Sequence, residues 1–368
     1  MEYINTITEA DEARPKGKVR VAFLDGIRGW AALIVVFSHL MGGVLALENA
    51  EFVSQPYFHF LTNGHLSVLI FFVLSGYVLS ISQIQSTKGN LPLAVVSRYF
   101  RLAIPVLFFA ILAYIFMSFG LFFNVKASIE NAWLGGFYVF EPSLYNALKF
   151  SIYDVFFNYD PNITYNSSAW TMPIELAGSM LIYAFIGIFK PQIKTLHIPS
   201  VIFTIFLYFN SPYMFCFMTG YLLAILKIRI HDINIKWFNF IILLCFISVI
   251  YIDTYHRPVE ENLQALEAIA IIFCASYSKT LKKFFESKVS LFLGEISFPL
   301  YLVQIIVICS WSSFLRIYFI ANEITGFASM FGILSSSLVI CIALSKLFIP
   351  VDKYSVIYSK KIASKLLM

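Results

Sequence analysis

Two side chains near the start of the chain, Arg28 and His39, are spaced for joint action on a long ligand. They lie eleven positions apart, and eleven steps of about 100° return an α-helix to nearly the same face, roughly 16 Å further along its axis. Histidine is the side chain best suited to take a proton from an alcohol near neutral pH. A cation in line with such a base would suit a thread-like anionic substrate. A histidine that only packs between helices is the ordinary alternative.

Four further residues are candidates for the same chemistry. Asp25 could hold or charge-balance Arg28, and capping of the first helix explains it equally well. Arg98 and Arg101 could grip phosphate groups, because arginine binds phosphate in a bidentate manner, although basic residues also anchor helices on the cytoplasmic side. Glu175 could organise an acceptor hydroxyl, or interact with free amides at the start of its helix.

The composition places these residues in a membrane protein. Hydrophobic residues make up 59% of the 368 positions and charged residues 13%, against about 25% charged residues in soluble domains, and the mean hydropathy is +0.79. So many apolar side chains cannot all be buried in a soluble core. The sequence therefore predicts an all-α polytopic membrane protein in contact with the lipid bilayer, and it argues against nucleic acid binding because the net charge is only +5.

Ten stretches are apolar over most of the roughly 20 residues that a membrane-spanning helix needs. Lys and Arg gather on one side of them, with 22 of the 26 on the side that carries both termini. Since basic residues favour the cytoplasmic face, both termini are expected to be cytoplasmic. The predicted spans are 30–47, 65–84, 101–123, 171–189, 196–211, 212–228, 237–253, 263–279, 291–314 and 325–349.

The remaining segments divide the chain into a membrane domain, expected over 23–350, and two cytoplasmic tails. Residues 1–22 are polar and 351–368 are basic. The one long external loop, 124–170, is rich in aromatic residues, and it either covers a site or serves as a plain connector. The five cysteines sit singly inside apolar runs, so neither a disulfide nor a metal site is predicted.

Five segments together resemble the motifs of the membrane-bound acyltransferase 3 family. They occur in the family's order over most of the chain, and their combination is more specific than any one alone. The segments are Phe23-Leu24-Asp25-Gly26-Ile27-Arg28-Gly29-Trp30 with His39, Phe71-Phe72-Val73-Leu74-Ser75-Gly76-Tyr77, Arg98-Tyr99-Phe100-Arg101-Leu102 with Pro105, Trp170-Thr171-Met172-Pro173-Ile174-Glu175, and Leu293-Gly294-Glu295-Ile296-Ser297-Phe298-Pro299-Leu300-Tyr301-Leu302.

The resemblance implies a ten-helix O-acyltransferase with no permanently bound cofactor. Acyl-CoA, most simply acetyl-CoA, would be its donor substrate. His39 corresponds to the family's essential histidine, Arg28 to its upstream partner, and Arg98 with Arg101 to the basic pair near the CoA. Glu175 corresponds to the family glutamate as a site organiser. The residues Ser75, Trp170 and Tyr301 stand in acceptor-side or structural motifs.

One position departs from the family pattern. Gln304 stands where many members have a histidine, which puts a second catalytic histidine in doubt and concentrates the chemistry on His39. The acceptor implied is a hydroxyl of a cell-surface polysaccharide or of its lipid-linked precursor, and the expected location is the inner membrane of a bacterium. A protein partner cannot be inferred. Two other classes stay open: a multi-span transporter or flippase for an anionic or glycan-linked substrate, and a receptor or scaffold without chemistry.

Overall fold

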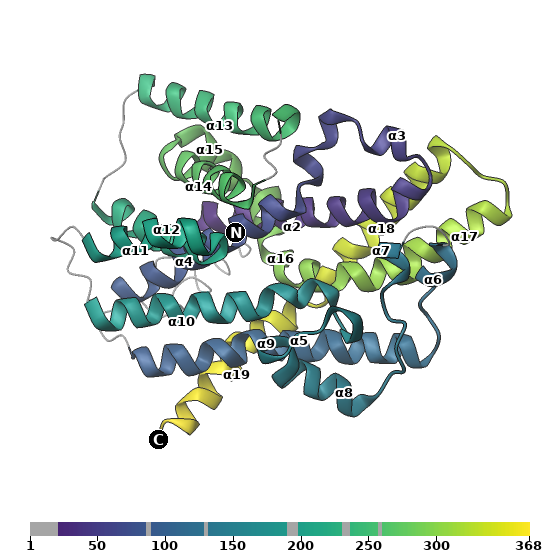
Figure 1. The fold of residues 1–368 in the computed structure, drawn as a ribbon, viewed down its shortest axis with the longest axis horizontal. Coiled ribbons are helices and arrows are strands. Elements are labelled where there is room, and N and C mark those ends of the chain that lie inside the picture. The colour runs from purple at the N-terminus through teal and green to yellow at the C-terminus, as the bar shows by residue number, and fades with distance from the viewer. Residues whose placement is uncertain (1–20, 86–89, 129–131, 190–197, 230–235, 257–259) are drawn as a thin grey trace, which may run out of the picture.

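The computed structural model describes residues 21–85, 90–128, 132–189, 198–229, 236–256 and 260–368, and the view in Figure 1 shows them as a bundle of helices. Every regular element in these residues is a helix, as the apolar composition predicted. A lipid environment explains this, because a helix satisfies its backbone hydrogen bonds within one segment. Residues 1–20, most of the predicted N-terminal tail, lie outside the described residues.

Seven helical segments in the described residues are long and apolar enough to cross a membrane. Some of them join several elements: α2 (Ala22–His39) continues through η1 (Leu40–Val44) and η2 (Leu45–Leu47), and α16 (Lys288–Val307) continues through η8 (Ile308–Ser312) into α17 (Ser313–Ala321). The other five contain α4 (Gly64–Ile84), α5 (Leu91–Ser118), α10 (Met172–Phe189), α13 (Lys236–His256), and α18 (Phe327–Leu347) joined to α19 (Ile349–Leu366).

The other three predicted spans fall on shorter helices. These are α11 (Ile198–Asn210), α12 (Pro212–Arg229) and α14 (Glu261–Tyr277), of which the first has 13 residues and the last 17. All ten predicted ranges therefore coincide with helices, while seven segments meet the length and composition of a membrane span.

Two helices begin well before the predicted boundaries. The first begins at Ala22 instead of residue 30, and the third begins at Leu91 instead of residue 101. Arg28 consequently lies inside α2, and both Arg98 and Arg101 lie inside α5. The prediction ended the apolar count at these charges, whereas the helices continue because the charges have partners inside the bundle.

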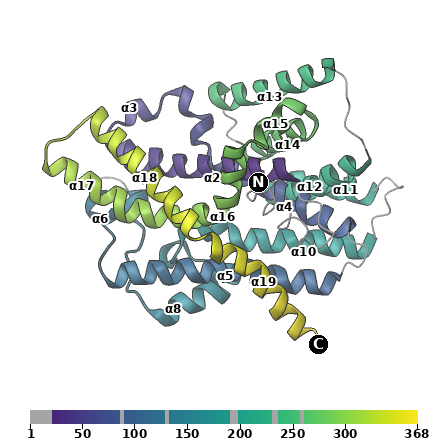
Figure 2. The same cartoon turned by 180° about the vertical axis from the view of Figure 1, so that it is seen from behind.

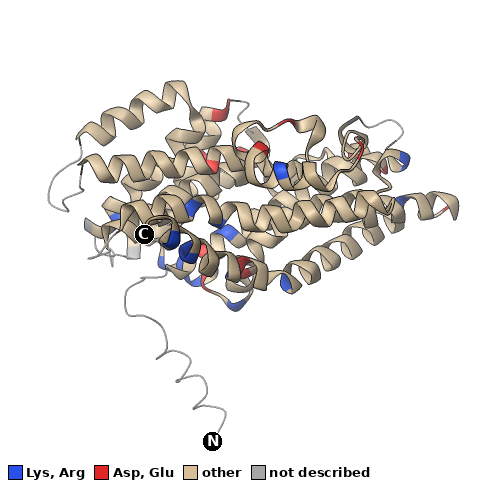
Figure 3. Ribbon diagram, turned by 90° about the horizontal axis from the view of Figure 1, so that it is seen from below, with Lys and Arg blue, Asp and Glu red and all other residues tan. Residues whose placement is uncertain are grey.

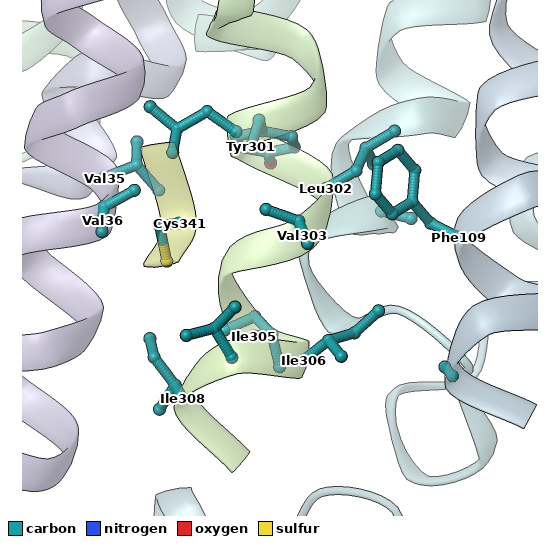
Figure 4. Close-up of a cluster of buried hydrophobic side chains, with 14 of the residues drawn as sticks. Val35, Val36, Phe109, Tyr301, Leu302, Val303, Ile305, Ile306, Ile308 and Cys341 are labelled. Atoms are coloured by element: carbon teal, nitrogen blue, oxygen red, sulfur yellow. The ribbon is translucent and has the colours of Figure 1, made fainter. Parts of the chain in front are cut away.

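The helix α16 (Lys288–Val307) forms the centre of the bundle. Figure 4 shows its side chains between those of α2 and α18 on one side and Phe109 of α5 on the other. Twelve of the thirteen residues from Ser297 to Cys309 are buried. The helix α13, by contrast, is mostly exposed and lies at the edge of the bundle in Figure 1. The candidate residues of α16 are thus enclosed by protein on several sides.

Backbone approach fixes α2 against α16. A Cβ atom added at Gly29 would lie 2.4 Å from the Gly294 nitrogen, and one added at Gly294 would lie 2.4 Å from the Asp25 carbonyl oxygen. Small residues permit such close helix packing in membranes. Trp30 adds a hydrogen bond from its Nε1 to Ser290 Oγ, at 3.0 Å. The two motifs that contain these glycines therefore lie side by side.

The C-terminal segment is a helix that packs back on the bundle. In Figure 2, α18 and α19 cross the back of the molecule in sequence, and α19 passes α5 and the end of α16. The predicted basic tail 351–368 falls within α19 except at its end. Figure 3 shows that the Lys and Arg of the described residues are concentrated in the half of the bundle that holds the C-terminus.

Candidate functional site

The last residue of α2 is His39, and the helix changes its geometry directly after it. Residues Leu40–Val44 form the π-helix η1, a local irregularity that is frequent at functional sites. Arg28 lies eleven residues earlier on the same face of α2. Between them on that face lie Ala32 and Val35, both buried and small. One face of α2 therefore runs from a guanidinium to an imidazole along about 16 Å of helix.

Arg98 is bound by two residues of α10, one of which also binds a residue of α4. Its Nη2 donates to Glu175 Oε2 at 2.6 Å, and its Nε donates to Ser179 Oγ at 2.8 Å. Ser75 donates its hydroxyl proton to the same carboxylate, 2.9 Å from Oε1. Side-chain exposure is only 17% for Arg98 and 11% for Glu175, so α4, α5 and α10 meet at a buried charge pair.

Arg101 points to the C-terminal helix. Its Nη2 lies 2.8 Å from Asp352 Oδ1, its Nη1 donates to Ser355 Oγ, and its guanidinium lies 5.7 Å from the ring centroid of Phe298. Arg98 and Arg28 lie close enough to Arg101 for electrostatic interaction, and Arg28 lies close enough to Glu175 for the same. The three arginines predicted from the sequence thus form one cluster.

The ion pair of Arg28 is the longest and most exposed of the ion pairs that the three arginines form. Arg28 Nη1 lies 3.4 Å from Asp25 Oδ1, and 33% of the Arg28 side chain is exposed. Because a longer and more exposed ion pair is the easier one to exchange, Arg28 is the arginine best placed to accept a new anion.

A stripe of α16 links the arginine cluster to His39. Phe298, Tyr301 and Gln304 follow one another at three-residue spacing, so they share one face over about 9 Å. Phe298 lies against Arg101, and Tyr301 OH lies 3.1 Å from Thr171 Oγ1 and donates to Ser168 O at 2.7 Å. Gln304, the third residue, is fully buried beside His39.

The loop 124–170 supplies a cover for His39. The short helix α7 (Ala132–Gly135) brings Trp133 onto the imidazole, with 5.5 Å between ring centroids and 28° between ring planes. Gly43 makes room for the indole, because a Cβ atom there would lie 2.7 Å from the ring. The loop 124–170 therefore covers the candidate site, which is one of the two predicted alternatives.

Polar contacts fix this loop against the helices. Asn124 donates from Nδ2 to Leu134 O at 2.9 Å and to Phe137 O at 2.8 Å, while buried Asn166 donates to Leu302 O of α16 at 2.8 Å. Tyr159 donates to Ser167 O at 3.2 Å, and burial raises the pKa of this phenol, so it remains a donor at neutral pH. The loop is held as an ordered lid over His39.

Most of the predicted site residues lie along one path. Arg28, Arg98, Arg101, Glu175 and Ser75 meet at one end, and His39 lies at the other. Tyr301 lies between these ends on α16, with its hydroxyl 3.1 Å from Thr171 Oγ1. Trp170 lies apart, in ring contact with Tyr213 at 6.2 Å.

Several partners of the site could not be identified from the sequence. Asp352 lies 251 positions after Arg101 in a segment predicted as a tail. The contact between Trp133 and Gly43 depends on the path of the loop, which the sequence does not give. In the sequence, Gln304 stands out only as a departure from the family pattern. The signal for Trp133 was weak, since it was one aromatic residue among many in the loop. No group of three His, Cys, Asp or Glu side chains suited to a metal occurs in the described part of the chain.

Comparison with known protein families gives one match. The sequence model of the acyltransferase 3 family, described as an acyltransferase domain, matches residues 21–346. This range contains all five motif segments and ends just before α19. Neither a curated protein nor a solved structure matches the chain.

Proposed function

Since the chain belongs to the acyltransferase 3 family, we propose that it transfers an acetyl or related acyl group from cytoplasmic acyl-CoA to a hydroxyl on the other side of the membrane. The acceptor proposed is a cell-surface polysaccharide or its lipid-linked precursor, and the location is the inner membrane of a bacterium. The observation that carries this proposal is the single helix face from Arg28 to His39, with the α16 stripe beside it.

The arginine cluster suits the donor end of such a substrate. Coenzyme A carries phosphate groups, and guanidinium groups bind phosphate through paired hydrogen bonds. Arg28 would bind first, because its own carboxylate partner is 3.4 Å away. Arg98 and Arg101 are oriented by Glu175 and Asp352 and add positive charge to the same place.

The pantetheine arm of the donor would then extend along the α2 face toward His39. The thioester at its end is the reactive group, and the distance from Arg28 to His39 is about 16 Å along the helix axis. Ala32 and Val35, which lie between the two residues on this face, are small and buried. Such an arrangement brings a cytoplasmic donor to the external half of the bundle without moving the coenzyme across the membrane.

Two reaction routes at His39 satisfy the same geometry. In direct transfer, the imidazole takes the proton from the acceptor hydroxyl while the hydroxyl oxygen attacks the thioester carbon. The C–S bond then breaks, and the proton passes from the imidazole to the CoA thiolate. In a relay, the imidazole nitrogen attacks the thioester carbon first, the C–S bond breaks, and CoA leaves as a thiolate that takes up a proton. The acceptor oxygen then attacks the carbonyl carbon of the acyl-imidazole, the C–N bond breaks, and the proton of the acceptor hydroxyl passes to the released imidazole nitrogen. Both routes need one unprotonated nitrogen of His39, which faces the acceptor hydroxyl in direct transfer and the thioester carbon in the relay.

The test measures base-labile O-acyl esters on cell-envelope glycans and lipids by mass spectrometry. Cells that lack the gene are compared with cells restored with wild type, His39→Ala or Arg28→Ala at equal membrane levels. An ester is expected only with wild type, and the modified molecule identifies the acceptor. Equal restoration by His39→Ala would show that His39 only packs, and an ester independent of the gene would end the proposal.

A further inference from the structure

A cavity of about 160 Å³ lies between two membrane-spanning segments and the connection from α2 to α4. The first span contributes Phe37, Met41 and Leu45 to its lining, and α18 contributes Met330 and Leu334. The connection closes the cavity with three short helices, which are α3 (Ala50–Val53), η3 (Pro56–Phe58) and η4 (Phe60–Thr62). None of these residues belongs to the candidate site described above.

The lining of this cavity offers no strong hydrogen-bonding group to a ligand or to water. Among the described residues that line it, Thr62 has the one hydroxyl, and its Oγ1 already donates to Phe58 O at 3.0 Å. A cavity holds water only where two or more polar groups bind it, whereas an apolar cavity of about 150 Å³ stays dry and binds small hydrocarbons. The cavity therefore suits a hydrocarbon ligand.

The cavity reaches from the interior of the protein to its apolar surface. At one end lie the exposed side chains of Leu61, Phe327 and Phe331, and the two phenylalanines belong to a membrane-spanning segment. At the other end Met41 and Met330 are almost fully buried. Methionine is flexible and adapts to the shape of an apolar partner. A hydrocarbon chain can therefore pass from the bilayer into the space between the two spans.

We propose that this cavity binds the end of one acyl chain of a bilayer phospholipid. The lining accepts hydrocarbon, and phospholipid chains are the hydrocarbon that surrounds a membrane-spanning helix. Because the cavity is continuous with the surface that the bilayer covers, the chain enters it without crossing water. Insertion fills a space that would otherwise lack contacts, which stabilises the packing of the first span against α18.

The position of the cavity relative to His39 favours a phospholipid over a lipid-linked acceptor. Phe37 and Met41 lie two positions before and after His39, and two steps of about 100° place them about half a turn away from the imidazole. Trp133 contacts both His39 and Gly43 on the opposite side. A chain in the cavity therefore lies behind α2 and supports the turn that carries His39, while its head group is not presented to the imidazole. This assignment does not depend on the proposed acyl transfer.

Photolabelling of the full-length protein tests whether a chain enters the cavity. The purified protein is reconstituted in vesicles of phosphatidylethanolamine and phosphatidylglycerol, with a trace of phosphatidylglycerol that carries a diazirine at the end of one acyl chain. After irradiation, peptide mass spectrometry locates the attached lipid. Labels are expected on Met41 and Met330, which are buried, as well as on exposed apolar residues such as Val339. Labelling of Val339 without either methionine would show that the cavity holds no acyl chain.

Two tryptophan variants on α18 separate the cavity from the outer surface. Leu334→Trp fills the cavity, whereas Val339→Trp adds bulk to the same helix at an exposed residue that does not line it. Labelling of Met41 and Met330 should fall about tenfold in Leu334→Trp, because a filled space excludes the chain, and should stay close to wild type in Val339→Trp. Leu334→Phe replaces Leu334→Trp if the larger side chain prevents folding. Equal labelling of the methionines in the filled variant and in Val339→Trp would overturn the assignment.

Competition identifies the source of the chain. Unlabelled polyprenyl phosphate represents the lipid of a lipid-linked acceptor, and unlabelled phosphatidylglycerol is the reference competitor. At equal amounts, polyprenyl phosphate should reduce the labelling of Met41 and Met330 no more than phosphatidylglycerol does. A clearly stronger reduction by polyprenyl phosphate would assign the cavity to an acceptor lipid and contradict a phospholipid site. Acyl-CoA is absent from every sample, so a negative result here is distinct from a failure of the proposed function.

Discussion

Arg98 and Glu175 form an ion pair with 2.6 Å between Nη2 and Oε2, although both residues lie within apolar helices. Ser75 and Ser179 complete the hydrogen bonds of this pair. A charge inside a membrane-spanning bundle is expensive unless it is matched in this way. The pair explains how α5 can continue through a basic motif and still lie against α4 and α10.

Removal of one member of this pair should destabilise the protein strongly. Glu175→Ala leaves the Arg98 charge buried without its carboxylate, at an expected cost of about 3–5 kcal/mol. The double variant Arg98→Met with Glu175→Leu leaves no charge behind, so it should recover much of the thermal stability in detergent. Measurement of Tm for both single variants and the double variant forms a double-mutant cycle.

The same set of variants distinguishes structure from chemistry. If the arginine cluster binds the donor, the double variant should fold but show weaker transfer at low acyl-CoA concentration. A double variant as unstable as Glu175→Ala would show that Arg98 and Glu175 have no favourable interaction free energy, against what their geometry implies.

The helices could be predicted because their signal is local. Apolar runs of the required length located every span on a helix, and the spacing of Arg28 and His39 correctly placed both within one continuous α2 segment. The boundaries failed where charges entered the helices. Hydropathy treats Arg98 as the end of a span, whereas the energy of that residue depends on Glu175, which is 77 positions away in the sequence.

The partners in the site could not be predicted for the same reason. Asp352 meets Arg101, and Trp133 meets His39, only after distant segments have packed together. No periodicity within either segment encodes the contact. The family motifs supplied the arginines and the histidine, while α19 lies beyond the range that the family model matches.

The contact between Asp352 and Arg101 should affect binding of the donor. Asp352→Ala frees the Arg101 guanidinium, which is 26% exposed, from the partner that orients it. We expect the KM for acyl-CoA to rise about threefold to tenfold, because an arginine that is no longer preorganised must be ordered on binding. Steady-state kinetics of the purified protein in proteoliposomes measure this change.

Lys353 provides a matched control on the same helix. Lys353 forms an ion pair with Glu295 at 2.8 Å, and the two side chains are 65% and 43% exposed. Exposed ion pairs contribute little to stability. Lys353→Met should leave the KM close to that of wild type. A fall in KM for Asp352→Ala would instead show that Asp352 competes with the phosphates for Arg101.

Gly29 should not tolerate even a methyl group. Gly29→Ala would place a Cβ atom 2.4 Å from the Gly294 backbone nitrogen, and the separation of α2 from α16 that follows should cost about 1–3 kcal/mol. Because both site stripes lie on these two helices, acyl transfer should also fall. Gly42→Ala, at a glycine with nothing within 4 Å of the added Cβ, is the control and should leave Tm and transfer nearly unchanged. Equal Tm values for the two variants would contradict direct backbone packing of α2 on α16.

Trp133 should protect the His39 site from water. The indole covers one face of the imidazole and is itself 41% exposed, so it stands between His39 and solvent. In Trp133→Ala, water should reach the thioester, and hydrolysis of acyl-CoA without transfer should increase relative to transfer to the acceptor. Trp237→Ala is the control, because Trp237 lies on α13 with 76% exposure, far in sequence from the loop. The measurement is the ratio of free thiol released to ester formed in proteoliposomes. A Trp133→Ala protein that loses transfer and hydrolysis together would show that the indole shapes the site without acting as its barrier to water.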